Sequence, residues 1–514
     1  MTTLNRLMVT VLVFGTLAFS QTIHYKVPAP TGALDQANAR EGTRGPRDIR
    51  RVESPVQFGE SHLVVEFAGV PTDAQIAGLR ARGARVLQAM PDNAVLISSA
   101  RALDLSGLGV VSAEALPPAV KVSPLTEATD DLVVEFHPDV DMNQARGIVL
   151  SAGLDLHENP DIGDHRLLVR RVNTRARASD VVRAIAARDE VAYVFPASED
   201  LVTGRPVIPC AGAVTNGGTV AQYIATVGNG WDGAGLGSAA LKYFWGNPTV
   251  KLPPAQAWGE IVRAMNEWSK VASVSWSQGT SAAGAKTIAV LFGTGNHGDG
   301  YPFDGPGNVL AHTFYPANPE PIAGDMHLDD AESWRIGANI DLYSVALHEL
   351  GHALGLGHSD DPNAVMYPYY RMATTLQADD RKAILTLYAV STGTATPVPT
   401  PAPAPPTPAP VPTPAPAPAP TPNDRTAPTL TISNPSTTTS TVTIATRAIS
   451  GTVYDLGGVA SVTWVNSLGG AGTAAGTSNW SANIPLQYGL NYITVRATDR
   501  TGNYSWRTIL ITRR

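Results

Sequence analysis

The feature that most constrains this chain is a short run that reads HELGHALGLGH, in which histidines and one glutamate recur at fixed spacing. On a helix, residues four apart lie on one face, so His348 and His352 can bind one metal ion. Glu349 follows the first histidine, where its carboxylate can reach a water at that ion. Gly355 permits the backbone conformation that ends a helix, and the turn would bring His358 back as a third ligand. Three neutral nitrogens with one open position are what a hydrolytic zinc requires.

The length of this run makes it specific. A histidine pair with a glutamate after the first histidine occurs often by chance, and a purely structural helix explains many such matches. The extension through His358 is far more specific, and residues 364–368, which read AVMYP, follow after a short gap. The arrangement resembles the metzincin clan and, within it, the matrixins, the matrix metalloproteinase family of zinc endopeptidases. The resemblance covers about residues 238–390.

The resemblance implies both a fold and a reaction. The fold is an α/β catalytic domain with a twisted mixed sheet and three helices, the last of them expected over residues 376–388. The reaction is hydrolysis of peptide bonds in protein or peptide substrates. Zinc polarises the scissile carbonyl and acidifies its bound water. Glu349 acts as general base towards that water and then as general acid towards the leaving amine.

The resemblance also implies roles for individual residues. The catalytic zinc would be bound by His348, His352 and His358, with Met366 as the Met-turn beneath it. A second, structural zinc with no open position would be held by His297, Asp299, His312 and His327. A structural calcium would be bound by the carboxylates of Asp304, Asp329 and Glu332 and by the carbonyls of Gly305, Gly307 and Val309. The pocket that receives the side chain after the scissile bond would be lined by Ser344, Pro368 and Tyr370, and the small serine implies a deep pocket.

The chain has one cysteine, Cys210, among 514 residues. One thiol cannot close an intramolecular disulfide, which excludes a disulfide scaffold, a multi-cysteine zinc finger and a cysteine-ligated iron–sulfur cluster. Matrix metalloproteinases keep a prodomain cysteine at a similar place, whose thiolate occupies the fourth zinc position. The resemblance makes Cys210 a candidate inhibitory latch, although Arg205 stands five residues ahead of it and the family's Pro-Arg-Cys-Gly order is absent. The alternative is an incidental free thiol.

The N-terminal half is predicted to be a signal peptide followed by a propeptide. Residues 1–20 carry one arginine, an uncharged and mostly apolar run, and small residues before Gln21. This pattern predicts a cleaved signal peptide and hence a secreted, extracellular protein with no membrane span. The segment 63–67 (LVVEF) recurs at 132–136. The propeptide, residues 21–210, is therefore predicted to contain two tandem α+β modules at about 60–124 and 125–200, followed by the protease domain at 211–390.

A Pro-rich linker, residues 391–426, separates the protease domain from a C-terminal region, because alternating proline forbids a packed core. Residues 427–514 alternate in strand-like fashion with turns about every ten residues, including a strand at 441–444, which predicts an all-β sandwich. It resembles the Ig-like modules appended to bacterial secreted enzymes. Its tryptophans, Trp464, Trp480 and Trp506, either fill the sandwich core or form a binding surface.

Charge and motifs separate the possible functions. The net charge of −7 and the lack of a basic block argue against nucleic-acid binding. Two alternatives to a zymogen remain: a matrix-binding or cell-surface protein whose working part is the C-terminal module, and a catalytically dead protease scaffold. The intact Glu349 argues against both. The C-terminal module is then expected to tether the enzyme to extracellular matrix or a surface, or to act as a spacer.

Overall fold

The structure is a computed structural model. It describes residues 23–25, 61–69, 71–90, 93–157, 159, 161–171, 178–203, 207–210, 214–215, 218–219, 222, 224–233, 236–307, 309–393, 427–437 and 439–514. The predicted signal peptide, most of the predicted linker and Arg205 lie outside the described residues. Among the described residues, no helix has both the length and the apolar character needed to cross a membrane.

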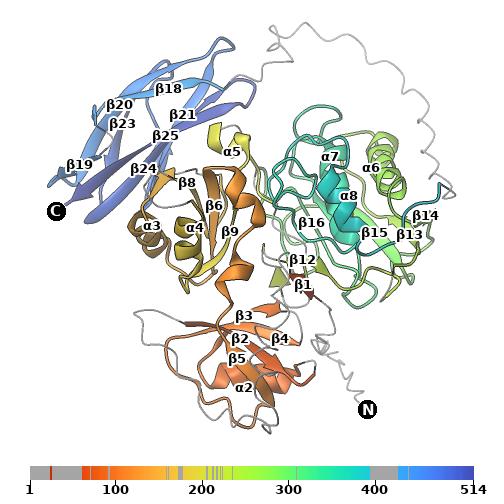
Figure 1. The fold of residues 1–514 in the computed structure, drawn as a ribbon. Coiled ribbons are helices and arrows are strands. Elements are labelled where there is room, and N and C mark those ends of the chain that lie inside the picture. Colours follow the sequence, from red (N-terminus) through yellow and green to blue (C-terminus); the bar gives the residue numbers. More distant parts are fainter. Residues whose placement is uncertain are drawn as a thin grey trace, which may run out of the picture.

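The catalytic region contains a five-stranded mixed sheet, drawn in green to teal in Figure 1. Its order is β14-β13-β15-β17-β16, and only the β16–β17 pair is antiparallel. The strands are β13 (Ala239–Trp245), β14 (Val274–Gln278), β15 (Thr287–Gly293), β16 (Ala311–Thr313) and β17 (Met326–Asp329). The helices are α6 (Pro254–Ser269), α7 (Leu342–Ala353) and α8 (Ala378–Ile384). The mixed sheet with few helices is confirmed, but the last helix is shorter than the expected 376–388.

Helix α7 carries the histidine run, and local chemistry sets both of its ends. Asp341 caps the N-terminus, because its side chain accepts a hydrogen bond from the Ser344 amide at 3.0 Å. Just past the C-terminus, Gly355 has a φ of +107°, a conformation that side chains with a Cβ rarely adopt. Inside the helix, a Cβ on Gly351 would lie 2.3 Å from the Met366 sulfur. Glycine is therefore required where the Met366 side chain packs against the helix.

The N-terminal region holds two four-stranded antiparallel sheets of the same order, β3-β4-β2-β5 and β7-β8-β6-β9. The recurring LVVEF segments lie in β2 and β6, which occupy equivalent positions. The first module comprises β2 (Ser61–Phe67), α2 (Asp73–Ala81), β3 (Arg85–Met90), β4 (Ala94–Ser99) and β5 (Val110–Glu114). The second comprises β6 (Asp131–Phe136), α3 (Met142–Ser151), β7 (Leu154–His157), β8 (Arg166–Arg171), α4 (Ala178–Ala186) and β9 (Val191–Pro196), followed by α5 (Glu199–Thr203).

A buried ionic contact joins the two modules. His62, in β2, is 4% exposed and lies 2.8 Å from Asp189 through Nδ1 and 2.9 Å from Asp139 through Nε2, both in the second module. Its ring stacks on His137 at 4.1 Å. Burial opposes a charge on His62, but its hydrogen bonds to the two carboxylates outweigh this and raise its pKa to about 9. His62 is therefore held as a cation between two acids, and this contact fixes the first module to the second.

The C-terminal region is all-β, with a three-stranded sheet of order β18-β20-β23 and a five-stranded sheet of order β19-β25-β24-β21-β22. The strands are β18 (Thr429–Asn434), β19 (Thr439–Val442), β20 (Thr446–Tyr454), β21 (Val459–Asn466), β22 (Ala471–Thr473), β23 (Asn479–Pro485), β24 (Gly489–Asp499) and β25 (Tyr504–Arg513). The strand predicted at 441–444 lies two residues earlier, as β19. Trp464 and Trp480 are buried in the sandwich, whereas Trp506 is half-buried and packs against a different cluster, described below.

Short paired strands precede the mixed sheet in the chain. β1 (Ile23–Tyr25) pairs antiparallel with β12 (Ile224–Val227), and β10 (Val214–Thr215) pairs with β11 (Gly218–Thr219). β12 also bonds to the loop after α7, where the Val227 amide donates to the Gly355 carbonyl at 2.9 Å and the Gly357 amide donates to the Ala225 carbonyl at 2.7 Å. The chain just before the catalytic sheet is thereby held against the turn that leads to His358.

Candidate active site

Two groups of metal-binding side chains form in the part of the chain that the structure describes. In each group, one ligand atom per residue lies within 4.8 Å of all the others. The first group consists of Cys210, His348, His352 and His358, and the second of His297, Asp299, His312 and His327. The fold thus brings together the residues predicted for each of the two zinc sites.

Hydrogen bonds orient the histidines of the first group for a metal. Nδ1 of His348 donates to the Val365 carbonyl and Nδ1 of His352 to the Leu356 carbonyl, each at 2.7 Å. Because a carbonyl oxygen only accepts, each Nδ1 carries the proton and each Nε2 keeps its lone pair. The two Nε2 atoms are 3.1 Å apart, close to the ~3.3 Å expected for two nitrogens on one tetrahedral zinc. Burial lowers the pKa of His348 to about 4 and that of His352 well below its usual value. These residues fit zinc.

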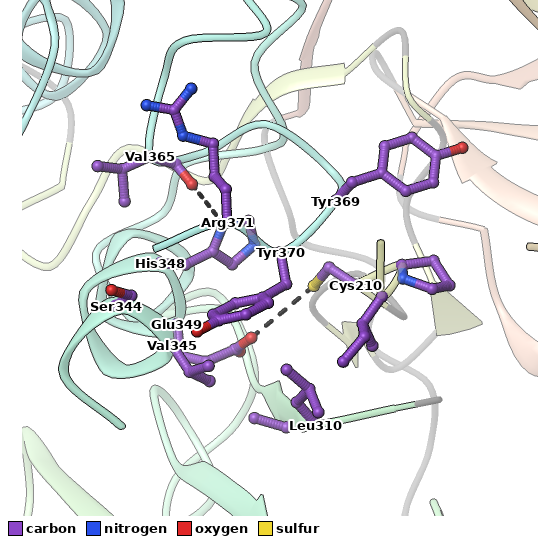
Figure 2. Close-up of a pocket in the computed structure, with 13 residues that line it drawn as sticks. Cys210, Leu310, Ser344, Val345, His348, Glu349, Val365, Tyr369, Tyr370 and Arg371 are labelled. Atoms are coloured by element: carbon purple, nitrogen blue, oxygen red, sulfur yellow. Dashed lines mark hydrogen bonds between the residues drawn. The ribbon is translucent and has the colours of Figure 1, made fainter. Parts of the chain in front are cut away.

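Glu349 lies beside this group with its carboxylate held in place (Figure 2). It is 3% exposed, and burial raises its pKa to about 7. Its Oε2 accepts a hydrogen bond from the Thr313 hydroxyl at 2.7 Å, and its Oε1 lies 3.8 Å from the Cys210 sulfur. Thr313 therefore positions the carboxylate from strand β16, a role that sequence reasoning missed.

The second group converges on one carboxylate oxygen. Oδ2 of Asp299 lies 2.8 Å from Nε2 of His297, 2.7 Å from Nε2 of His312 and 2.7 Å from Nδ1 of His327. Nδ1 of His297 contacts the Gly295 carbonyl at 2.9 Å, so its Nε2 again keeps the lone pair. Burial alone would raise the pKa of Asp299, but its histidine contacts lower it below the usual range. Three nitrogens and one anionic oxygen fit a four-ligand zinc with no open position.

The residues predicted for calcium adjoin one another but do not form a third group as tight as these two within the described residues. Asp329 and Glu332 are almost fully buried. Burial raises the pKa of both carboxyls, and repulsion from Asp304 adds to each shift. Oδ2 of Asp329 is buried and accepts no hydrogen bond. Backbone amides contact the other two carboxylates, with Gly307 donating to Glu332 at 2.6 Å and Val309 to Asp304 at 3.3 Å. Gly305 has a φ of +92° in the same loop.

A pocket opens beside His348 and Glu349. Of the residues predicted to line it, Ser344 and Tyr370 do so, whereas Pro368 is absent from the lining. The Tyr370 hydroxyl accepts a hydrogen bond from the Asp341 amide at 2.7 Å, and the Ser344 hydroxyl donates to the Asp341 carboxylate at 2.7 Å. Asp341 therefore ties the helix start to the pocket wall, a second role that sequence reasoning missed.

The segment Val207–Cys210, called the Val207–Cys210 strand below, lies in the cleft and is joined to the pocket wall by an isolated antiparallel bridge between Pro209 and Tyr369. The Cys210 amide donates to the Pro368 carbonyl at 2.9 Å, and the Tyr370 amide donates to the Ile208 carbonyl at 2.7 Å. This pairing carries the Cys210 sulfur to 3.9 Å from Nε2 of His352. Figure 2 shows the sulfur pointing towards Glu349. Backbone pairing along the pocket wall therefore aims the thiol at the histidine group.

The second N-terminal module braces the same wall. The Tyr367 hydroxyl donates to the Pro196 carbonyl at 2.9 Å, and the Tyr369 hydroxyl donates to the Ile162 carbonyl at 2.8 Å. The Tyr193 hydroxyl donates to the Asp360 carboxylate at 2.6 Å, close to His358 in the chain. These tyrosines join elements far apart in the sequence, and no motif signalled these contacts.

Comparison with known proteins identifies two parts of the chain. The sequence profile of the matrixin family matches residues 236–389, so the chain carries a matrixin domain. The profile of glucodextranase domain B matches residues 428–514, the two-sheet C-terminal region. The finer assignment of that region to the Ig-like class stays a prediction.

Curated proteins are similar to this chain over about the same domain length. Matrix metalloproteinase-20 of Homo sapiens is 45% identical over 133 residues, which cover 25% of this chain and 27% of that protein. Matrilysin of Homo sapiens is 44% identical over 134 residues, which cover 25% of this chain and 49% of that protein. Karilysin of the bacterium Tannerella forsythia is 40% identical over 159 residues, which cover 30% of this chain and 34% of that protein. The chain thus spans less than half the length of each of these relatives.

Proposed function

We propose that this chain, with its matrixin domain, is a secreted zinc metalloendopeptidase made as a latent zymogen. The observation that carries the proposal is the convergence of His348, His352 and His358 beside the buried Glu349, at the edge of a pocket. The substrates are proteins or peptides that lie along the pocket wall, where Val207–Cys210 lies in the latent chain. The predicted signal peptide and the extracellular location belong to the same proposal.

The chain's own residues would perform the proton transfers of peptide hydrolysis. A zinc ion held by the three histidines would polarise the scissile carbonyl and acidify a water. Glu349 takes a proton from the attacking water and then delivers it to the leaving amine. The hydrogen bond from Thr313 keeps the carboxylate directed at the reacting centre. His348 and His352 stay neutral and oriented through their carbonyl partners.

We further propose that the second histidine group holds a structural zinc, which leads to a prediction about metal content. Asp299→Ala removes the only anionic member of that group and should lower the zinc content from two ions per chain to one. The unfolding temperature should fall by several degrees, since a structural metal stabilises the fold that binds it. Elemental analysis and thermal unfolding measure both effects.

Asp155→Ala, at an exposed site with 61% of the side chain accessible, is the matched control. A content of two zinc ions in Asp299→Ala would contradict this assignment.

Calcium is the third metal of the proposal. The buried and unpaired oxygen of Asp329, together with Asp304 and Glu332, supports a hard cation in the loop. The carbonyls of Gly305, Gly307 and Val309 would complete its shell. This ion would stabilise the loop that also carries His297 and Asp299, and it would take no part in the chemistry.

Specificity after the scissile bond should follow the size of Ser344. The side chain is small and buried at the pocket, so the pocket should accept long aliphatic or aromatic side chains. Profiling of cleavage sites in a peptide library should show this preference, and Ser344→Leu should shift it towards small residues by about tenfold or more. A wild-type profile restricted to glycine and alanine would contradict the deep pocket.

The function as a whole is tested by following one protein sample through activation. N-terminal sequencing and zinc analysis of the secreted chain before and after activation, with casein cleavage measured on the same samples, identify the cut site and the metal content. The proposal expects two zinc ions, cleavage only after the segment before β13 is cut, and loss of cleavage with a chelator. Cleavage that persists in metal-free protein would contradict it. A matrix or surface tether through the C-terminal region remains a separate expectation.

A further inference from the structure

The C-terminal sandwich lies against the second N-terminal module (Figure 1). Arg496, in β24, forms an ion pair with Asp161 at 3.0 Å, and both side chains are partly buried. Tyr504, in β25, is 3% exposed, and the Arg496 guanidinium lies 3.6 Å above its ring centroid. The Tyr504 hydroxyl accepts a hydrogen bond from the Val207 amide at 3.0 Å. The contact therefore combines an ion pair with a hydrogen bond to the backbone of Val207.

Apolar packing extends this contact. Trp506, half-buried in β25, packs against a cluster that contains Ile162, Val207 and Tyr369. On the same side, the Arg146 guanidinium of α3 lies 4.9 Å from the centroid of the Tyr492 ring. Of the three tryptophans predicted either to fill the core or to bind, Trp506 is the one that reaches outside the sandwich. One face of the sandwich, formed by β24 and β25, thus makes every one of these contacts.

The parts that the sandwich touches are the parts that close the cleft. Val207 is the first residue of the Val207–Cys210 strand, three residues before the thiol. Asp161 belongs to a loop whose next residue, Ile162, accepts the hydrogen bond from the Tyr369 hydroxyl on the pocket wall. A Cβ on Gly163 would lie 3.4 Å from the Pro209 side chain, so the loop also lies close to the strand. The sandwich therefore holds the strand and the loop that supports it.

From this geometry we infer that the C-terminal sandwich docks in cis on the propeptide and stabilises the closed position of Cys210. Its partner is this chain's own second module together with the Val207–Cys210 strand. The inference rests on the proposed latent zymogen. It adds a regulatory role for the C-terminal sandwich, which was expected only to tether the enzyme or to act as a spacer. Release of the sandwich would loosen the strand before any cut is made.

The test uses the full-length, zinc-loaded latent chain and two readouts that need no peptidase activity. The first is the rate at which a thiol reagent modifies Cys210, which is unambiguous because the chain has one cysteine. The second is hydrogen exchange of the Val207 amide. Tyr504→Phe removes the acceptor of that amide and the hydroxyl's hydrogen bond to Asp161. It should speed both thiol modification and amide exchange by about three- to tenfold or more. Tyr454→Phe, at a residue 70% exposed, is the matched control and should change neither.

Variants on the propeptide side keep the test decisive if Tyr504→Phe disturbs the sandwich. Asp161→Asn should speed thiol modification without touching the sandwich core. Its effect and that of Arg496→Gln should be less than additive, because both changes break the same ion pair. Rates equal to wild type in all three variants would overturn the docking. The proposed function is judged separately, by casein cleavage with the activated wild-type chain. If that chain cleaves casein, equal modification rates overturn only the docking. If it does not, the proposed function is wrong, whatever the modification rates show.

Discussion

Replacement of Glu349 by alanine should abolish peptide cleavage while leaving both metal groups intact. The carboxylate is the only acidic side chain among the described residues that line the pocket, and proton transfer by such a group accelerates reactions by about 10²–10⁴-fold. We therefore expect the rate of casein cleavage by the activated variant to fall by about a thousandfold or more. The zinc content should stay at two ions per chain, because Glu349 is not a predicted ligand.

A matched glutamate separates this effect from a general loss of charge. Glu320 is exposed on the same domain, and Glu320→Ala should keep wild-type cleavage within about twofold, as surface substitutions usually do. Thr313→Val should give an intermediate loss, since it leaves Glu349 in place without its positioning hydrogen bond. Wild-type cleavage by Glu349→Ala would contradict the mechanism outright.

Replacement of Cys210 by serine should release the latent chain. The thiol is aimed at the histidine group by the strand that pairs with the pocket wall, with its sulfur 3.9 Å from Nε2 of His352. Four ligands share a zinc binding free energy of about 10–16 kcal/mol, so one ligand contributes about 3 kcal/mol. Loss of that bond should raise cleavage by the uncut chain about 100-fold. The measurement is casein cleavage by freshly purified, uncut protein.

A neighbouring substitution shows whether the thiol or the strand is responsible. Pro209→Ala keeps the thiol and the backbone pairing of Val207–Cys210, so this variant should stay latent within a few-fold of wild type. If Cys210→Ser is as latent as wild type, the thiol is not the latch. Equal activation of both variants would instead assign latency to packing of the strand.

The two groups of side chains that could hold a metal were predictable because their signal is local or ordered along the chain. The period of the helix alone places His348 and His352 on one face. Gly355 alone indicates the left-handed turn that brings His358 back to them. The all-β C-terminal region likewise follows from patterns within short segments, whereas the mixed sheet was implied by the resemblance to the matrixins. The end of α8 was not predictable to a residue, since helix ends depend on tertiary packing as much as on sequence.

The residues that orient the site were not predictable, because long-range packing creates their contacts. Thr313 and Glu349 are 36 residues apart and meet only where β16 lies beside α7. The Tyr369–Ile162 and Tyr504–Val207 hydrogen bonds join residues 207 and 297 positions apart. Tyrosine is common in sandwich and protease cores alike, so neither its type nor its spacing signals such a contact.

The central claim is that one metal site is closed by the chain's own thiol and opens for hydrolysis. X-ray absorption at the zinc edge tests it most directly, because Cys210 is the only thiol in the chain. We expect a sulfur neighbour at about 2.3 Å from zinc in the latent protein. That sulfur should be lost after activation, in the same samples in which casein cleavage appears. Zinc without a sulfur neighbour in the latent chain, or with one retained in the fully active enzyme, would contradict the account.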